Sequence, residues 1–270
     1  TMKQLKACVR ANLQFYRRNN LLVIFMYVLM FIVIASMVPS LFNLSNTKSF
    51  SMIKRFMTTL NGAVYYFTVA VGLLTLSAPI RKRSLKLVLT KPCKLWTWIL
   101  SHYVAVLGLS ALLYAGISLL GSALFLMSGL PLQDGLLFVP LDYFCRTAIV
   151  FSVTLFLTSF IHPLIAVVFI VFLNDSILYK PLLFIKAGLQ SMEPSSWRTS
   201  LQGLKYVVQG LYLMMPNYAP FSRKTKGIYK SFNVPTESWI YLAGSLAYAL
   251  IVGAFCFLLI HAILNYRNLT

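Results

Sequence analysis

The stretch Leu95–Met127, "LWTWILSHYVAVLGLSALLYAGISLLGSALFLM", contains no Asp, Glu, Lys or Arg along its whole length. A membrane-spanning helix needs about 20 predominantly apolar residues to cross about 30 Å of hydrocarbon. This stretch is longer than that, so it predicts a transmembrane helix whose first turns extend out of the bilayer on one side. The fold class therefore depends on whether the rest of the chain has the same character.

The composition indicates an integral membrane protein. Of the 270 residues, 59% are hydrophobic and 11% are charged, and the mean hydropathy is +0.78. Soluble domains average about 45–50% apolar and about 25% charged residues. The formal net charge of +19 would suit a nucleic-acid binder, but the hydropathy does not, so we expect no nucleic-acid partner. Basic loops facing anionic lipid explain the charge, since each Lys or Arg near a membrane surface contributes about 1 kcal/mol.

The apolar stretches predict an all-α protein with six transmembrane helices in a single domain, residues 1–270. The predicted helices are 21–42, 62–80, 95–127, 141–160, 162–179 and 238–264. The fourth and fifth are too long together for one crossing, and Pro163 should interrupt a continuous helix, so we expect a tight turn there. Arg146 lies near one end of the fourth span, where its side chain is expected to reach the interface.

The distribution of Lys and Arg in the short loops predicts the orientation. With the N-terminus inside, the inner segments carry twelve of these residues and the short outer loops carry three. The chain is therefore expected to have both termini in the cytoplasm. The segment 180–237 is then external, and its further basic residues are tolerated because long loops largely escape the rule.

Three short stretches have amphipathic helical patterns. In residues 1–20, Leu5, Val9, Leu13 and Tyr16 share one face and basic residues share the opposite one, which favours a helix lying in the membrane interface. Residues 84–94 place Leu85, Val88 and Leu89 at helical spacing, and Pro92 ends the pattern. A third helix is expected within the external segment, around Arg198–Gln209, and should stop before Pro216.

Motifs for catalysis are missing from the sequence. It contains no Gly-Lys dipeptide for a phosphate-binding loop, no HExxH and no GxSxG. The four cysteines and three histidines are scattered, so we expect no metal site and no cofactor. Asp175 is the one acid expected close to membrane depth, either as a polar contact in a conduit, as a partner of Arg146, or as a residue already at the head groups. The chain is therefore predicted not to be an enzyme.

The order of these parts resembles the permease subunits of export-type (ABC-2) ABC transporters over nearly the whole chain. "SLKLVLTKPCKLWTWILSHYVA" (Ser84–Ala105) is similar to the family's short coupling helix followed by a span, with Leu85, Leu87, Leu89, Lys91 and Pro92 fitting the pattern. "LMMPNYAPFS" (Leu213–Ser222) is similar to a Leu-Pro-Asn-aromatic element before the last span.

The resemblance implies a function and a set of site residues. Residues 1–20 would be an elbow helix, small outer helices would sit between spans five and six, and the coupling helix would dock on a cytoplasmic ATP-binding subunit. The implied docking residues are Ser84, Leu85, Lys86, Val88, Leu89, Lys91 and Pro92. The family's conduit lies at a dimer interface formed by spans two and five, which implies Tyr65, Tyr66, Phe67, Asn174 and Asp175 as lining residues.

The same resemblance implies partners and a location. Two copies of the ATP-binding subunit and a second permease chain, identical or homologous, would complete an exporter in the bacterial inner membrane. An external partner protein and anionic lipids are further expected partners. Two other functions stay open: a non-transporting membrane scaffold or assembly factor, and a membrane enzyme acting on lipid. The substrate is not readable from the sequence.

Overall fold

The computed structural model describes residues 2–18, 27, 31, 46–81, 94–172, 175–191, 196–214 and 227–269. All regular structure in these residues is helical, which confirms the all-α prediction. The helices are α1 (Met2–Arg18), α3 (Asn46–Arg81), α5 (Leu95–Met127), α6 (Gly135–Phe160), α7 (Pro163–Phe172), α8 (Asp175–Ser191), α9 (Ser196–Met214), α11 (Ile228–Ser231) and α12 (Thr236–Leu269).

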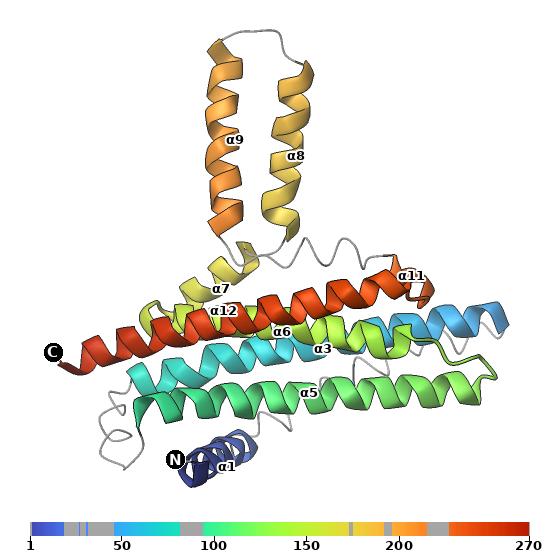
Figure 1. Ribbon diagram of the computed structural model, residues 1–270, viewed down its shortest axis with the longest axis horizontal. Coiled ribbons are helices and arrows are strands. Elements are labelled where there is room, and N and C mark those ends of the chain that lie inside the picture. The colour runs from blue at the N-terminus through green and yellow to red at the C-terminus, as the bar shows by residue number, and fades with distance from the viewer. Residues whose placement is uncertain are drawn as a thin grey trace.

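Helices α3, α5, α6 and α12 lie side by side in an elongated bundle (Figure 1). Each is long and apolar enough to cross a membrane, over Phe50–Leu73, Leu95–Met127, Gly135–Phe160 and Thr236–Tyr266. Large apolar side chains on the outside of the bundle, such as Leu112 and Leu119, are more than 70% exposed. Such surfaces are rare on soluble monomers and are expected where helices face lipid. The fold is therefore that of an all-α membrane protein.

Helices α3 and α6 begin earlier in the sequence than the spans predicted there. Helix α3 begins at Asn46 instead of residue 62, because the sequence between has no Gly or Pro to end a helix. Helix α6 begins at Gly135 instead of residue 141 and contains Pro140. Pro140 is the sixth residue of α6, so it removes one hydrogen bond inside the helix without ending it. The bounds 95–127 are confirmed, and α12 contains the predicted 238–264.

The segment 162–179 does not form the single predicted span. The turn before it is confirmed, because α6 ends at Phe160, Ile161 is extended and α7 starts at Pro163. Helix α7 has only 10 residues, or about 15 Å, which is half of a bilayer core. A separate helix, α8, starts at Asp175 and continues to Ser191, within the segment expected to be external.

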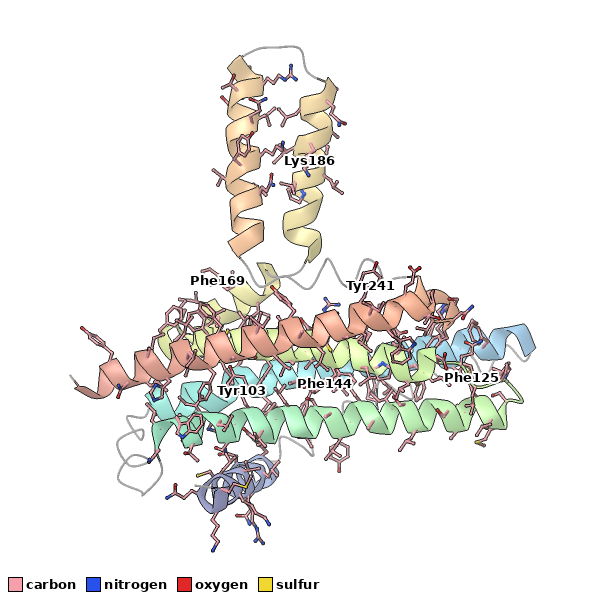
Figure 2. All side chains as sticks on the ribbon, in the orientation of Figure 1. Tyr103, Phe125, Phe144, Phe169, Lys186 and Tyr241 are labelled. Carbon is pink, nitrogen blue, oxygen red and sulfur yellow. The ribbon has the colours of Figure 1, made fainter. Side chains whose placement is uncertain are left out.

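Helices α8 and α9 form a hairpin that stands away from the bundle (Figure 1). As expected, α9 ends before Pro216. Several large apolar side chains on the hairpin are exposed, including Phe184, Trp197 and Tyr206, and Lys186 lies on α8 among them (Figure 2). The hairpin contacts the rest of the chain mainly through α7.

The core of the bundle has two parts. One surrounds Met57, Phe125 and Phe232 at the end where α5 stops, as the labelled Phe125 shows in Figure 2. The other surrounds Ile99, Phe151 and Ile260 near the opposite end and includes Tyr16 of α1.

The two termini lie at the same end of the bundle (Figure 1). Helix α1 runs across the beginning of α5 there, close to the end of α3 and to the C-terminus of α12. The predicted first span, 21–42, and nearly all of the predicted coupling helix lie outside the described residues.

Candidate functional site: polar groups between apolar helices

The amphipathic helix α1 packs on α5 through a small polar contact. The Asn12 amide donates a hydrogen bond to the Ser101 hydroxyl over 2.8 Å, and the Tyr16 hydroxyl lies 3.3 Å from Nδ1 of His102. Tyr16 is 2% exposed, and burial raises the pKa of its hydroxyl above the ordinary value of 10.0. The apolar face of α1 was expected to lie in lipid. Its residue Tyr16 is instead buried in the bundle, since α5 offers both apolar contact and hydrogen-bond partners.

This contact joins α1 to the start of α5, the helix that follows the predicted coupling segment in the sequence. Helix α5 begins at Leu95, directly after residues 84–94. Ser101 and His102 are the seventh and eighth residues of this helix, about two turns from its start. A helix transmits a displacement along its axis because its backbone hydrogen bonds run from turn to turn. A force applied before Leu95 would therefore reach α1 as well as the bundle.

A second group of polar residues lies deep among α3, α5 and α6. The Tyr114 hydroxyl lies 2.7 Å from the Thr147 hydroxyl, which itself donates to the Tyr143 carbonyl over 2.7 Å. Asn61 is fully buried beside them, and its carbonyl oxygen is 3.4 Å from the Tyr114 hydroxyl. Both polar atoms of the Asn61 side chain have no hydrogen-bond partner among the described residues. Buried amides are normally paired, so this position favours a bound water or another polar group.

Arg146 lies on the same helix as Thr147 and faces α3. Its guanidinium is 5.2 Å from the ring centroid of Tyr65, a cation–π contact that contributes up to about 2 kcal/mol when desolvated. Helix α6 starts at Gly135, so Arg146 lies about 16 Å along it, near the middle of the helix. The predicted span placed Arg146 nearer to one end, because α6 starts six residues before that span.

Asp142 lies one turn before Arg146 and is completely buried. Its carboxylate accepts a hydrogen bond from the Tyr229 hydroxyl of α11, and the rings of Tyr143 and Tyr229 are 5.6 Å apart. Residues four apart share one face of a helix. An acid and a base on one face of an apolar span are costly in a membrane, and such residues are functional candidates by default.

The predicted lining residues of α3 divide into two kinds. Tyr65 is half-buried under Arg146, and Tyr66 beside it is 71% exposed, with the two rings 5.2 Å apart. Phe67 instead packs against both parts of the core, so it does not line an open surface. Asn174 and the side chain of Asp175 lie outside the described residues, so their place beside this face stays a prediction.

The name polar face is used below for Tyr65, Tyr66, Asp142, Tyr143 and Arg146. Sequence reasoning found Tyr65 and Tyr66 but missed the acid and the base. The available signal was their spacing, since Asp142 and Arg146 are the charged residues of α6 and lie one turn apart. Within the described residues, no group of His, Cys, Asp and Glu could hold a metal ion. The polar face offers a guanidinium and tyrosine hydroxyls to a polar or charged group.

Comparison with known proteins adds no assignment: the chain matches no protein-family model, and no curated protein and no solved structure is significantly similar to it.

Proposed function

We propose that this chain is the membrane-spanning permease subunit of an ATP-driven exporter of the ABC-2 type. It would act as a dimer and take its energy from separate cytoplasmic ATP-binding subunits. The observation that carries the proposal is the polar face, in which Arg146 lies near the middle of an apolar helix and Asp142 lies about 10 Å from its start. A translocation path needs polar groups at membrane depth. In a purely structural helix bundle, burying the same groups in the membrane costs free energy and serves no function.

The contact of α1 with α5 supports the coupling part of the proposal. The predicted docking residues Ser84–Pro92 precede α5, and the polar contact at Ser101 and His102 ties α1 to the same helix. Movement of an ATP-binding subunit against residues 84–94 would then shift α5 and α1 together. Coupling of this kind needs a packed element with two discrete arrangements that both sites bias.

The docking claim is tested by co-purification. Leu85→Asp combined with Leu89→Asp places two charges on the apolar face that would contact the ATP-binding subunit. We expect this variant to lose its ATP-binding partner in mild detergent, as measured by mass spectrometry of the purified complex. The matched control is Met127→Asp with Leu132→Asp, since both residues are exposed at the opposite end of the bundle. Equal partner recovery from the docking variant and the control would reject the docking role.

The path claim is tested by water accessibility at Tyr66. A cysteine reacts with a polar thiol reagent as its thiolate, which forms only in contact with water. In a background with the native cysteines replaced by serine, Tyr66→Cys is expected to react in membranes. Leu112→Cys is the control, because Leu112 is 73% exposed and Tyr66 is 71% exposed, yet Leu112 lies away from the polar face.

Reaction of Tyr66→Cys alone would support a water-accessible path. If neither cysteine reacts, position 66 faces lipid. The function as a non-transporting scaffold is then favoured over the function as a permease. The rate should also change when the ATP-binding subunits hydrolyse nucleotide, since the path opens and closes with them. A rate unaffected by nucleotide would separate a static water pocket from a transport path.

A further inference from the structure

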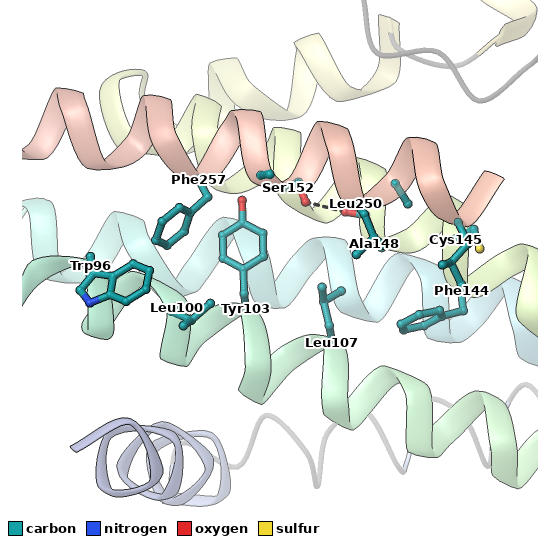
Figure 3. A pocket seen from close by; sticks show the side chains of 14 residues that line it. Trp96, Leu100, Tyr103, Leu107, Phe144, Cys145, Ala148, Ser152, Leu250 and Phe257 are labelled. Carbon is teal, nitrogen blue, oxygen red and sulfur yellow. Dashed lines mark hydrogen bonds between the residues drawn. The ribbon is translucent and has the colours of Figure 1, made fainter. Parts of the chain in front are cut away.

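A groove that is separate from the polar face opens between α5, α6 and α12. Its volume is about 460 Å3. Trp96, Tyr103 and Leu107 of α5 form one wall, Leu250 and Phe257 of α12 form the other, and Phe144 of α6 lies at one end (Figure 3). The rings of Trp96 and Phe257 meet edge to face with centroids 5.9 Å apart.

The lining of the groove is almost entirely apolar. Small residues of α6 and α12, including Ala148 and Gly253, leave the space between the larger walls. The Ser152 hydroxyl donates to the Ala148 carbonyl over 2.7 Å and is therefore already engaged. The Tyr103 hydroxyl points toward Ser152, so the few polar groups of the lining face one another (Figure 3). A stable water needs two to four polar partners, so the groove favours an apolar occupant.

The dimensions of the groove decide which apolar occupant fits. On both α5 and α12 the lining residues extend over twelve positions, or eleven steps, from Trp96 to Leu107 and from Leu246 to Phe257. At 1.5 Å per residue this is a length of about 16 Å. This is about half of the hydrocarbon core of about 30 Å, which is the depth that the acyl chains of one leaflet occupy. A transmembrane helix of a second copy would cross the whole core, about twice the length of the groove. A single extended acyl chain of one leaflet matches the length of the groove.

The ends of the groove fit a lipid in a defined direction. Trp96 is the second residue of α5 and is 49% exposed, and Lys94 just before it is exposed. Tryptophan is enriched at the level of the head groups, and a lysine there attracts anionic lipid. The opposite end, at Leu107 and Phe144, lies more than two turns deeper along the bundle.

We propose that this groove binds one acyl chain of a resident bilayer phospholipid, with the head group at the Lys94 end. The lipid fills space that the packing of α12 on α6 leaves open beside α5. Because lipid tails are as apolar as leucine, the chain is held by close packing with the aromatic walls and not by exclusion from water. The inference does not depend on the proposed transport function.

The wild-type protein provides the first test. It is reconstituted in nanodiscs that contain phosphatidylglycerol with a photoreactive diazirine in one acyl chain, and adducts are mapped by mass spectrometry. We expect adducts on Leu100 and Leu107 to exceed those on Leu112 and Leu119 by about tenfold, which corresponds to about 1.4 kcal/mol of preference. Leu112 and Leu119 are far more exposed, so labelling by bulk lipid alone would give the opposite order. That opposite order, or crosslinks to a second protein chain at the groove, would overturn the proposal.

A groove-filling variant provides the second test. A Cβ at Gly253 would meet only the Ser152 hydroxyl, at an ordinary contact distance of 3.5 Å, so Gly253→Leu can fold with its side chain directed into the groove. Gly108→Leu is the matched control, because nothing lies within 4 Å of a Cβ at Gly108. We expect Gly253→Leu to remove the excess labelling of Leu100 and Leu107 and Gly108→Leu to retain it. Equal labelling of Leu100 and Leu107 in the two variants contradicts the proposal. If Gly253→Leu does not fold, the labelling of these residues relative to Leu112 and Leu119 in the wild-type protein decides.

Discussion

Replacing Gly135 with alanine is expected to destabilise the protein by about 3 kcal/mol, the upper end for overpacking. The first residue of α6 lies directly against the chain before α12. Its N–H donates to the Phe232 carbonyl over 3.0 Å, and an added Cβ would lie 2.5 Å from that oxygen and 2.6 Å from the Phe232 Cα. Both are backbone atoms, which cannot rotate away as a side-chain end could. The measurement is a reversible SDS-unfolding titration in mixed micelles.

Phe232 cannot move to accommodate the methyl group. Its side chain is fully buried, 6.3 Å from the rings of both Phe50 and Phe125, and its backbone adopts a left-handed φ of 55°. A non-glycine residue in that conformation depends on its surroundings to hold it there.

The control for Gly135→Ala is Gly108→Ala. A Cβ at Gly108 meets nothing within 4 Å, so alanine there should stabilise α5 by about 0.5–1 kcal/mol through helix propensity. The two variants make the same chemical change with opposite expected signs. Similar effects from both would mean that α6 and the loop at Phe232 are not in close contact.

Replacing Tyr229 with phenylalanine is expected to cost about 2 kcal/mol, as for a hydrogen bond to a buried charged group. Its hydroxyl donates to the Asp142 carboxylate, and Asp142 is completely buried. The substitution keeps the ring that packs against Tyr143 and removes only the donor. The carboxylate is then left with fewer partners inside an apolar helix, which is costly.

A double-mutant cycle isolates this contact. In an Asp142→Asn background, where the acceptor is neutral, the cost of Tyr229→Phe should fall to about 1 kcal/mol. Tyr266→Phe serves as the control, because Tyr266 is 72% exposed and surface substitutions usually stay within about 0.5 kcal/mol. If Tyr229→Phe costs no more than Tyr266→Phe, the hydrogen bond to Asp142 contributes nothing to stability.

Hydropathy alone located the long helices because a bilayer imposes a minimum apolar length. The bounds of α5 follow from an uninterrupted apolar run between Lys94 and Ser128. The starts of α3 and α6 did not follow, because polar residues and a single proline near a helix end do not stop a helix that packs against neighbours. The division of 162–179 was missed because the polar residues Asn174, Asp175 and Ser176 were interpreted as the end of one span, whereas α7 ends at Phe172 and α8 begins at Asp175.

The amino-acid sequence by itself determined that the chain is an all-α membrane protein with a basic amphipathic start and no catalytic motif. These properties depend on composition and on periodicity along one segment. Only the tertiary structure decided that Arg146 stacks on Tyr65, that Asp142 pairs with Tyr229, and that α5 and α12 leave a narrow groove beside α6. The physical reason is that each of these features joins residues from different helices, and the rotation of a helix about its axis is fixed by the packing of its neighbours.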